Sequence, residues 1–394
     1  MVLTNKYLTD QLIPYIGNKR KLLGLISQAV HKTGLHEGTF FDVFSGSGVV
    51  SRMAKVMGFR VISNDWEQYS QTINRAYIEA NYAPDFKKLG GIDKAISELN
   101  SLDGHRGYIA SHYCPADDEN YDISIERMFY TQQNGRRIDG MREKIFDWYS
   151  SGNLTDLEND ILLACLVFQA AYCSNTSGVF KGFHNGWGGA TKTAWYRIRS
   201  CLTLKVPIFY DNMQHNIVLR DDATKIAPNV KCDIAYLDPP YNQHQYGANY
   251  HLLNTVVLWD KPKLNPFISG NGIKDKAAIR LDWRTQTKSL YCIKQQALDE
   301  FTRLINLLDT KYILTSYSTD GQMPTEDLLS ALNQRGRLSL VTKKYKRYRV
   351  SSQRPSEKGH TIEFVAIVDT SKVGREEDLH KSLIALETAM EITI

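Results

Sequence analysis

The chain has 394 residues, enough for one large catalytic domain with a substantial insertion or for two domains. Its hydrophobic content of 42% and charged content of 23% are those of a soluble globular protein, and because no run of about 18 apolar residues exists we expect no membrane span. The net charge of +5 is too common among enzymes to indicate a partner by itself.

The N-terminus, MVLTNKYLTD, contains no apolar segment followed by a cleavage site of small residues. We therefore expect no signal peptide and a cytoplasmic location. The six cysteines include no Cys-x-x-Cys pair and no histidine pair completes a zinc pattern, so neither a metal site nor a disulfide is expected. The sequence also lacks the Pro-Cys dipeptide used for attack on cytosine C5.

The first strongly patterned region predicts a βαβ unit. An apolar run at residues 40–44 ends in Ser45-Gly46-Ser47-Gly48, and a helix-compatible stretch follows. A second apolar run at residues 60–63 ends in Asn64-Asp65. Strand, glycine turn, helix, strand and acid in this order are typical of one unit of an α/β sheet.

The middle of the chain has a different pattern. Residues 66–213 are mostly helical in pattern, with loops rich in Gly, Asn and Ser, and strand signals resume only after them. The sequence therefore predicts an α/β sheet split by a long insertion. Further strands are expected at residues 217–220, 232–237, 312–316, 338–342 and 361–368, and a last helix at about residues 376–390.

The tetrad Asp238-Pro239-Pro240-Tyr241 follows one of these apolar strands, so it lies at the carboxyl edge of the predicted sheet, where α/β proteins bind ligands. Two consecutive prolines fix the backbone and remove two N–H donors, which leaves a rigid group of hydrogen-bond acceptors. An exocyclic amine needs such acceptors, and the Tyr241 ring can stack on a planar base. A proline-rich turn after a strand is the plain alternative.

The glycine turn favours a nucleoside-containing cofactor. Gly46 and Gly48 let a ligand approach the backbone, and the start of the next helix offers free N–H groups. Asp65, at the end of the second strand, is placed to accept both ribose hydroxyls. These features do not separate NAD from S-adenosylmethionine, but Ser51 stands where a dinucleotide site has its third glycine.

Two basic clusters are candidates for contact with nucleic acid. Residues 181–205 include five basic side chains and no acidic one, and residues 341–360 include seven against the single Glu357. Such clusters neutralise phosphates, although a solvated surface is the plain alternative.

The motifs together resemble a known family. The order Gly17-Asn18-Lys19, Asp42-Val-Phe-Ser-Gly-Ser-Gly, Asn64-Asp65, a long insert and Asp238-Pro-Pro-Tyr resembles the Dam-type (D12 class) N6-adenine DNA methyltransferases in their alpha arrangement. The tract after Tyr241 is similar to modification methylases of restriction systems, those of the FokI-modification type included. The resemblance implies a Rossmann-like S-adenosylmethionine-dependent fold. Residues 1–66 and 214–370 would form the catalytic domain, 67–213 a largely helical target-recognition insertion, and 371–394 a C-terminal helical tail.

The resemblance also assigns roles to residues. Asp238, Pro239, Pro240 and Tyr241 would be catalytic, with Asp222 near the cofactor adenine, although Asp221 fits equally well. Asn18 departs from the usual Gly-Gly-Lys, which affects the loop backbone rather than its lysine. The expected cofactor-binding residues are Tyr15, Lys19, Asp42, Phe44, Ser45, Gly46, Gly48, Asp65, Asp222 and Asp238.

The expected reaction is direct methyl transfer to adenine N6 in double-stranded DNA after the base swings out of the duplex. No metal and no covalent intermediate are required, and a cognate restriction endonuclease is a possible partner. On this interpretation the Tyr241 ring matters more than its hydroxyl. The expected DNA contacts are Arg136, Arg137, Lys181, Arg197, Arg199, Lys346, Arg347 and Arg349.

Three other functions compete. The tetrad also serves amino-methyltransferases that act on RNA or on protein glutamine. A nucleic-acid-binding module without catalysis is opposed by the intact tetrad. An NAD-dependent oxidoreductase is disfavoured by the spacing of the glycine turn.

Overall fold

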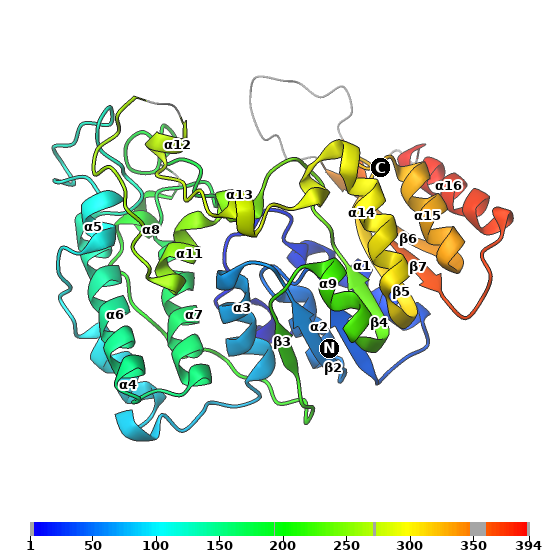
Figure 1. Cartoon of the computed structure of the whole chain (residues 1–394), viewed down its shortest axis with the longest axis horizontal. Coiled ribbons are helices and arrows are strands. Elements are labelled where there is room, and N and C mark those ends of the chain that lie inside the picture. Colours follow the sequence, from blue (N-terminus) through cyan, green and yellow to red (C-terminus); the bar gives the residue numbers. More distant parts are fainter. Residues whose placement is uncertain (1–3, 193, 271–272, 347–359, 392–394) are drawn as a thin grey trace.

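The computed structural model describes residues 4–192, 194–270, 273–346 and 360–391. It contains a seven-stranded sheet of order β3-β2-β1-β4-β5-β7-β6 (Figure 1). Strands β1 to β5 are parallel to one another, and β7 pairs antiparallel with both β5 and β6. The strands are β1 (Thr39–Asp42), β2 (Arg60–Asn64), β3 (Ile217–Leu219), β4 (Lys231–Leu237), β5 (Asp309–Ser318), β6 (Arg337–Lys346) and β7 (His360–Asp369).

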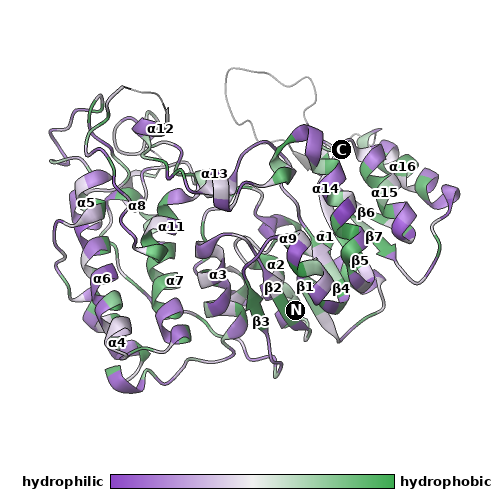
Figure 2. Cartoon of the chain, viewed as in Figure 1, coloured by the Kyte–Doolittle hydropathy of each residue, from purple (hydrophilic) through white to green (hydrophobic). Residues whose placement is uncertain are grey.

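Alternating residues of the strands enter two hydrophobic cores, one on each face of the sheet. On β4, Ile234 and Tyr236 belong to one core, whereas Ala235 and Leu237 belong to the other. Because successive side chains of a strand point to opposite faces, both faces are buried. Figure 2 shows hydrophobic residues along the central strands and hydrophilic residues on the outer loops.

Helices cover both faces. The first core is closed by α1 (Leu23–Lys32) and α2 (Val49–Val56). The second core is closed by α9 (Ala223–Ile226), α14 (Lys294–Leu307), α15 (Thr325–Arg335) and α16 (Glu376–Glu391). Helix α16 packs against β6 and β7 and contributes Leu386 to that core, so the predicted C-terminal helix is part of the layered domain.

The expected mixed α/β sheet is confirmed, and each predicted strand is present. Strands β5 and β6 extend beyond their apolar runs. At the start of β5, Asp309 is paired in register with Lys231 of β4, and both side chains are exposed. A search for apolar runs does not detect the polar residues at the solvent end of a strand. Those residues still belong to the strand, because backbone pairing does not require an apolar side chain.

The interval between β2 and β3 is helical and carries no strand among its described residues. Its helices are α3 (Gln68–Asn74), α4 (Ile92–Asn100), α5 (Tyr108–His112), α6 (Gln132–Ser150), α7 (Asp156–Tyr172) and α8 (Trp195–Arg199). Long loops separate several of them (Figure 1).

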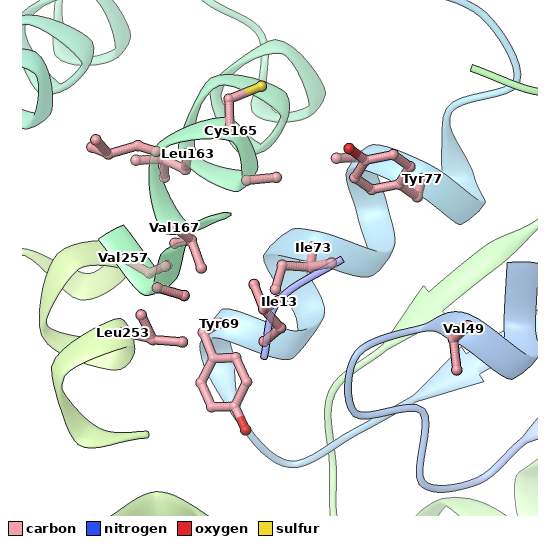
Figure 3. Close-up of a cluster of buried hydrophobic side chains, with 14 of the residues drawn as sticks. Ile13, Val49, Tyr69, Ile73, Tyr77, Leu163, Cys165, Val167, Leu253 and Val257 are labelled. Atoms are coloured by element: carbon pink, nitrogen blue, oxygen red, sulfur yellow. The ribbon is translucent and has the colours of Figure 1, made fainter. Parts of the chain in front are cut away.

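A second segment of the chain joins this helical region. After β4 come α10 (Tyr246–Asn249), α11 (His251–Leu258), α12 (Ile273–Lys276) and α13 (Trp283–Gln286). Helix α11 packs against α3 and α7. Figure 3 shows Leu253 and Val257 of α11 beside Val167 and Leu163 of α7. The helical region is therefore built from residues before β3 and residues after β4, and the boundary predicted at residue 213 marks only the first segment.

Candidate active site

The carboxyl ends of the central parallel strands meet at one edge of the sheet and border a cavity that is partly open to solvent. Nine residues that the sequence predicts for the site line this cavity: Tyr15, Lys19, Phe44, Asp65, Asp222, Asp238, Pro239, Pro240 and Tyr241. The other four, Asp42, Ser45, Gly46 and Gly48, are buried behind its wall.

The glycine turn after β1 has the backbone that only glycine adopts readily. Gly46 and Gly48 have φ angles of +50° and +77°, in the left-handed region. A Cβ on Gly46 would lie 2.8 Å from the Tyr15 ring, and one on Gly48 would lie 2.4 Å from Asn74 Oδ1. The turn is therefore closed from two sides, and Gly48 forms the N-cap of α2.

Asp65 links the end of β2 to the glycine turn. Its Oδ2 accepts a hydrogen bond from the Gly46 amide at 2.8 Å, and its Oδ1 accepts one from the Glu67 amide at 2.9 Å. Burial raises the pKa of Asp65, and these two bonds oppose the rise. Each carboxylate oxygen keeps a second lone pair, so Asp65 can still accept hydrogen bonds from two hydroxyls.

Asp42 is only 1% exposed and supports the turn from below. It accepts a 2.6 Å hydrogen bond from Ser51, the residue at the third-glycine position, while its Oδ1 has no partner among the described residues. Burial raises the pKa of Asp42 to about 7. Asp42 does not line the cavity, so its predicted role in cofactor binding would be indirect.

Lys19 is brought to the tetrad from the other end of the chain. Its ammonium lies 3.0 Å from Asp238 Oδ1 and donates a 2.8 Å hydrogen bond to the Tyr241 hydroxyl. The Tyr241 hydroxyl also lies 3.4 Å from Ser316 Oγ on β5. Burial raises the pKa of Asp238, and the Lys19 charge opposes this rise. Lys19, Asp238 and Tyr241 thus form one hydrogen-bonded group with Lys19 at its centre.

A tyrosine cluster holds the turn that carries Lys19. The Tyr250 hydroxyl accepts a 2.7 Å hydrogen bond from the Ile16 amide, and the Tyr246 hydroxyl donates to the Ile16 carbonyl at 3.3 Å. The Tyr15 ring stacks on Tyr250 at a centroid distance of 4.8 Å. The sequence motif did not predict this role for Tyr246 and Tyr250, because the contact joins segments far apart in the chain.

The two aspartates that the sequence offers for contact with the cofactor adenine both line the cavity. Asp222 is the N-cap of α9, and its Oδ1 accepts a 2.9 Å hydrogen bond from the Thr224 amide. The Asp221 amide donates to Asn64 Oδ1 at 3.1 Å, and the Asp221 side chain is exposed. The geometry therefore brings both residues to the site.

Residues 287–291 cross one side of the cavity and were not predicted for the site. Ser289 and Gln245 hold this segment through two reciprocal hydrogen bonds of 2.8 and 2.9 Å. The Tyr291 ring meets Phe44 edge to face at 5.1 Å. Glu67 and Glu300 also line the cavity, and burial raises the pKa of Glu67 to about 7. No local motif marks these residues.

The predicted DNA contacts have different surroundings. The structure corrects the prediction that Arg137 contacts DNA. The Arg137 side chain is buried, and its guanidinium donates to the carbonyls of Leu202, Leu102 and Asn100, which hold it in the interior. Its neighbour Arg136 is exposed. The presence of a basic residue in a helical segment of the sequence does not show whether its side chain faces solvent or the interior.

The other basic candidates are partly engaged. Arg197 binds carbonyls at the end of α7, that of Tyr172 among them, and Arg199 pairs with Glu119. Lys181 is half-buried, and burial lowers its pKa. The backbone of Lys346 ends β6, whereas Arg347 and Arg349 lie outside the described residues.

Within the described residues no group of three or more histidine, cysteine, aspartate or glutamate side chains is arranged to hold a metal ion. All six cysteines are free. None of the described helices is both long and apolar enough to span a membrane.

Comparison with known proteins decides the family. Residues 15–319 match the D12 class N6 adenine-specific DNA methyltransferases. The chain belongs to this family. It is similar to the type II methyltransferase M.NlaIII of Neisseria lactamica, with 30% identity over 90% of this chain and 98% of the relative.

Two longer relatives match this D12 class methyltransferase equally closely. The type II methyltransferase M.FokI of Planomicrobium okeanokoites is 29% identical over 93% of this chain and 55% of the relative. The modification methylase StsI of Streptococcus sanguinis is 30% identical over 94% of this chain and 53% of the relative. The chain thus spans about half the length of these two. No solved structure matches it.

Proposed function

We propose that this D12 class protein transfers a methyl group from S-adenosylmethionine to N6 of adenine at a specific sequence of double-stranded DNA. The observation that carries the proposal is the Lys19–Asp238–Tyr241 group in the lining of a cavity at the carboxyl edge of the sheet. A buried carboxylate beside two prolines supplies acceptors for the two hydrogens of an exocyclic amine.

The charges of the cavity support S-adenosylmethionine rather than a dinucleotide. Acidic side chains outnumber basic ones in the lining, where Lys19 is the basic residue; the acidic side chains are Asp65, Glu67, Asp221, Asp222, Asp238 and Glu300. A pyrophosphate would be repelled by this lining, whereas a sulfonium cation suits it. Asp65 would hold the ribose hydroxyls, and Phe44 with Tyr291 would contact the adenine ring.

When bound, the cofactor supplies an electrophilic methyl group. The residues of this chain would do the rest by positioning. Asp238 and the Pro239 carbonyl accept the N6 hydrogens, which directs the nitrogen lone pair toward the cofactor side of the cavity. Lys19 fixes the Asp238 carboxylate, and the Tyr241 ring contacts the base. Unstacking the adenine costs a few kcal/mol, which contact with an aromatic ring offsets by about 1–3 kcal/mol.

We assign the sheet to the Rossmann-like methyltransferase fold and the helical region to target recognition. The strand order supports the first assignment. Exposed aromatic and basic side chains support the second: Tyr196 is 84% and Trp195 37% exposed on α8, and the Arg199 guanidinium lies 5.6 Å from the Trp195 ring. Arg136 of the same region is also exposed. A cytoplasmic location and pairing with a restriction endonuclease follow from the similarity to modification methylases.

The test measures transfer of a tritiated methyl group to DNA, RNA and protein in parallel. We expect labelled N6-methyladenine in DNA hydrolysates, and label in RNA or protein alone would contradict the proposal. Sequencing that detects modified bases, applied to DNA from cells expressing the chain, should show one sequence motif fully methylated. Challenge of that DNA with nucleases that cut the motif then tests protection.

A further inference from the structure

Glu363 of β7 is a half-buried acid near the catalytic group, and neither the sequence motifs nor the family match gives it a role. Its Oε2 is buried and has no hydrogen-bond partner among the described residues. A buried carboxylate oxygen without a donor is unusual, because desolvating it costs free energy. Such a group calls for an explanation.

The strand register places Glu363 on the side of the sheet where Lys19 lies. Glu363 is paired with Ser318 of β5, two residues from Ser316, which contacts the Tyr241 hydroxyl. The next residue on the same face of β7 is Val365, which enters the core beneath α1. Helix α1 continues directly from the short 3-10 helix that begins at Lys19.

The charges agree with this placement. Burial raises the pKa of Glu363, the nearby Lys19 ammonium lowers it, and the Asp238 carboxylate raises it further. Asp320, after β5, also raises it, and Lys343 of β6 is its register partner on the other side. Lys19 has three N–H donors, and Asp238 and Tyr241 take two of them.

We propose that Glu363 is a positioning residue that acts through Lys19, by the field of its carboxylate on the ammonium from the same side of the sheet. This inference rests on the proposed methyl transfer. While Lys19 binds Asp238 alone, the ammonium withdraws electron density from the oxygens that must accept the N6 hydrogens. A second carboxylate on the same side of the sheet offsets part of the ammonium charge, so that Asp238 becomes a stronger acceptor when the base enters. Glu363 itself touches neither base nor cofactor.

The first test is Glu363→Gln, which keeps the side-chain volume and removes the charge. We expect the single-turnover rate of DNA methylation to fall about tenfold, the effect of weakening one charged hydrogen bond, with a smaller change in cofactor affinity. Glu363→Asp should recover part of the rate. Thr361→Val is the matched control, because Thr361 is buried on the same face of β7 and bonds Ser318 at 2.9 Å without carrying charge.

A double-variant cycle tests the route of the effect. If Glu363 acts through Lys19, adding Glu363→Gln to Lys19→Met should cost no further rate. Losses that multiply would overturn the proposal. So would equal losses in Thr361→Val and Glu363→Gln, or a Glu363→Gln rate within about twofold of the wild type, since such changes are ordinary surface effects.

A third measurement needs neither cofactor nor DNA. Urea unfolding of the wild type, Glu363→Gln, Lys19→Met and the double variant gives a double-mutant cycle for the free energy of unfolding. We expect the two substitutions to be coupled, with the double variant less destabilised than the sum of the single variants, because each single variant leaves one charge without its opposite. Additive effects would overturn the proposal. If the wild type leaves DNA unmethylated, the proposed function fails, while this measurement still decides the link between Glu363 and Lys19.

Discussion

Lys19 Nζ donates a 2.8 Å hydrogen bond to the Tyr241 hydroxyl across 222 positions of the chain. The same ammonium pairs with Asp238 and lies 4.2 Å from the centre of the Tyr241 ring. One buried cation therefore fixes both side chains that the proposed reaction uses. The two prolines make the backbone of the tetrad rigid, and Lys19 fixes the side chains of Asp238 and Tyr241.

Substituting Asp238 should separate catalysis from cofactor binding. Asp238→Asn keeps the shape but loses the charge that Lys19 and the N6 hydrogens need, and we expect methylation to fall by at least about a hundredfold, as when one preorganised hydrogen-bonding group is removed. Cofactor affinity, measured by calorimetry, should change much less, because Asp65 and the glycine turn are untouched. Equal losses in both would place Asp238 in cofactor binding alone.

The hydroxyl of Tyr241 should matter more than the sequence predicts. Tyr241→Phe keeps the ring but removes the acceptor of the Lys19 bond, and a charged hydrogen bond contributes about 1.5–3 kcal/mol, so a rate loss of roughly tenfold or more is expected. Tyr241→Ala should lose more, since the ring goes too. Full activity of Tyr241→Phe would show that the Lys19 contact is dispensable for the reaction.

Arg136 and Arg137 are neighbours with opposite expected effects. Arg137→Met removes the guanidinium donor of three buried or partly buried carbonyls, and a buried group left unsatisfied costs about 1–3 kcal/mol, so thermal unfolding should shift to lower temperature. Arg136→Ala removes an exposed side chain, so stability should stay within about 0.5 kcal/mol. DNA affinity measured in a salt series should weaken for Arg136→Ala. An unchanged affinity would show that Arg136 does not contact DNA.

These neighbours also show what a sequence can reveal about this protein. The glycine turn and the apolar strand before Asp238 are local signals, because turn geometry and hydrophobic runs depend on adjacent residues. They locate the sheet edge, Asp65 and the tetrad. Burial of Arg137 depends instead on carbonyls at Asn100, Leu102 and Leu202, which only the folded chain brings together.

The parts of the site that were missed share this dependence on distant contacts. Tyr246 and Tyr250 hold the turn at Ile16, and residues 287–291 close the cavity through Gln245. Helix α11 joins α3 and α7 although it follows β4 in the chain. Such pairings are set by packing between elements, and a single sequence carries no signal for them beyond composition.

Asp42 should make the protein less stable as pH rises. Its pKa is about 7 in the folded state because of burial, above the ordinary aspartate value of 3.8 that the unfolded chain retains. At a pH between these two pKa values, Asp42 is therefore protonated in the folded state and ionised in the unfolded state. The contribution of Asp42 to the free energy of unfolding is largest below pH about 4. It falls by roughly 1.4 kcal/mol per pH unit above that, until the pH passes the folded-state pKa.

Asp42→Asn removes this titration while its amide oxygen still accepts from Ser51. Urea unfolding of both proteins at pH 5, 6, 7 and 8 gives the difference in the free energy of unfolding, which isolates Asp42 from other titrating groups. We expect the wild type to lose stability relative to Asp42→Asn between pH 5 and 7 and the difference to level off above pH 7. A difference that is flat over this range, or that changes in the opposite direction, would mean that Asp42 is ionised in the folded protein. Its carboxylate would then have a cation or donor near Oδ1 that balances the charge.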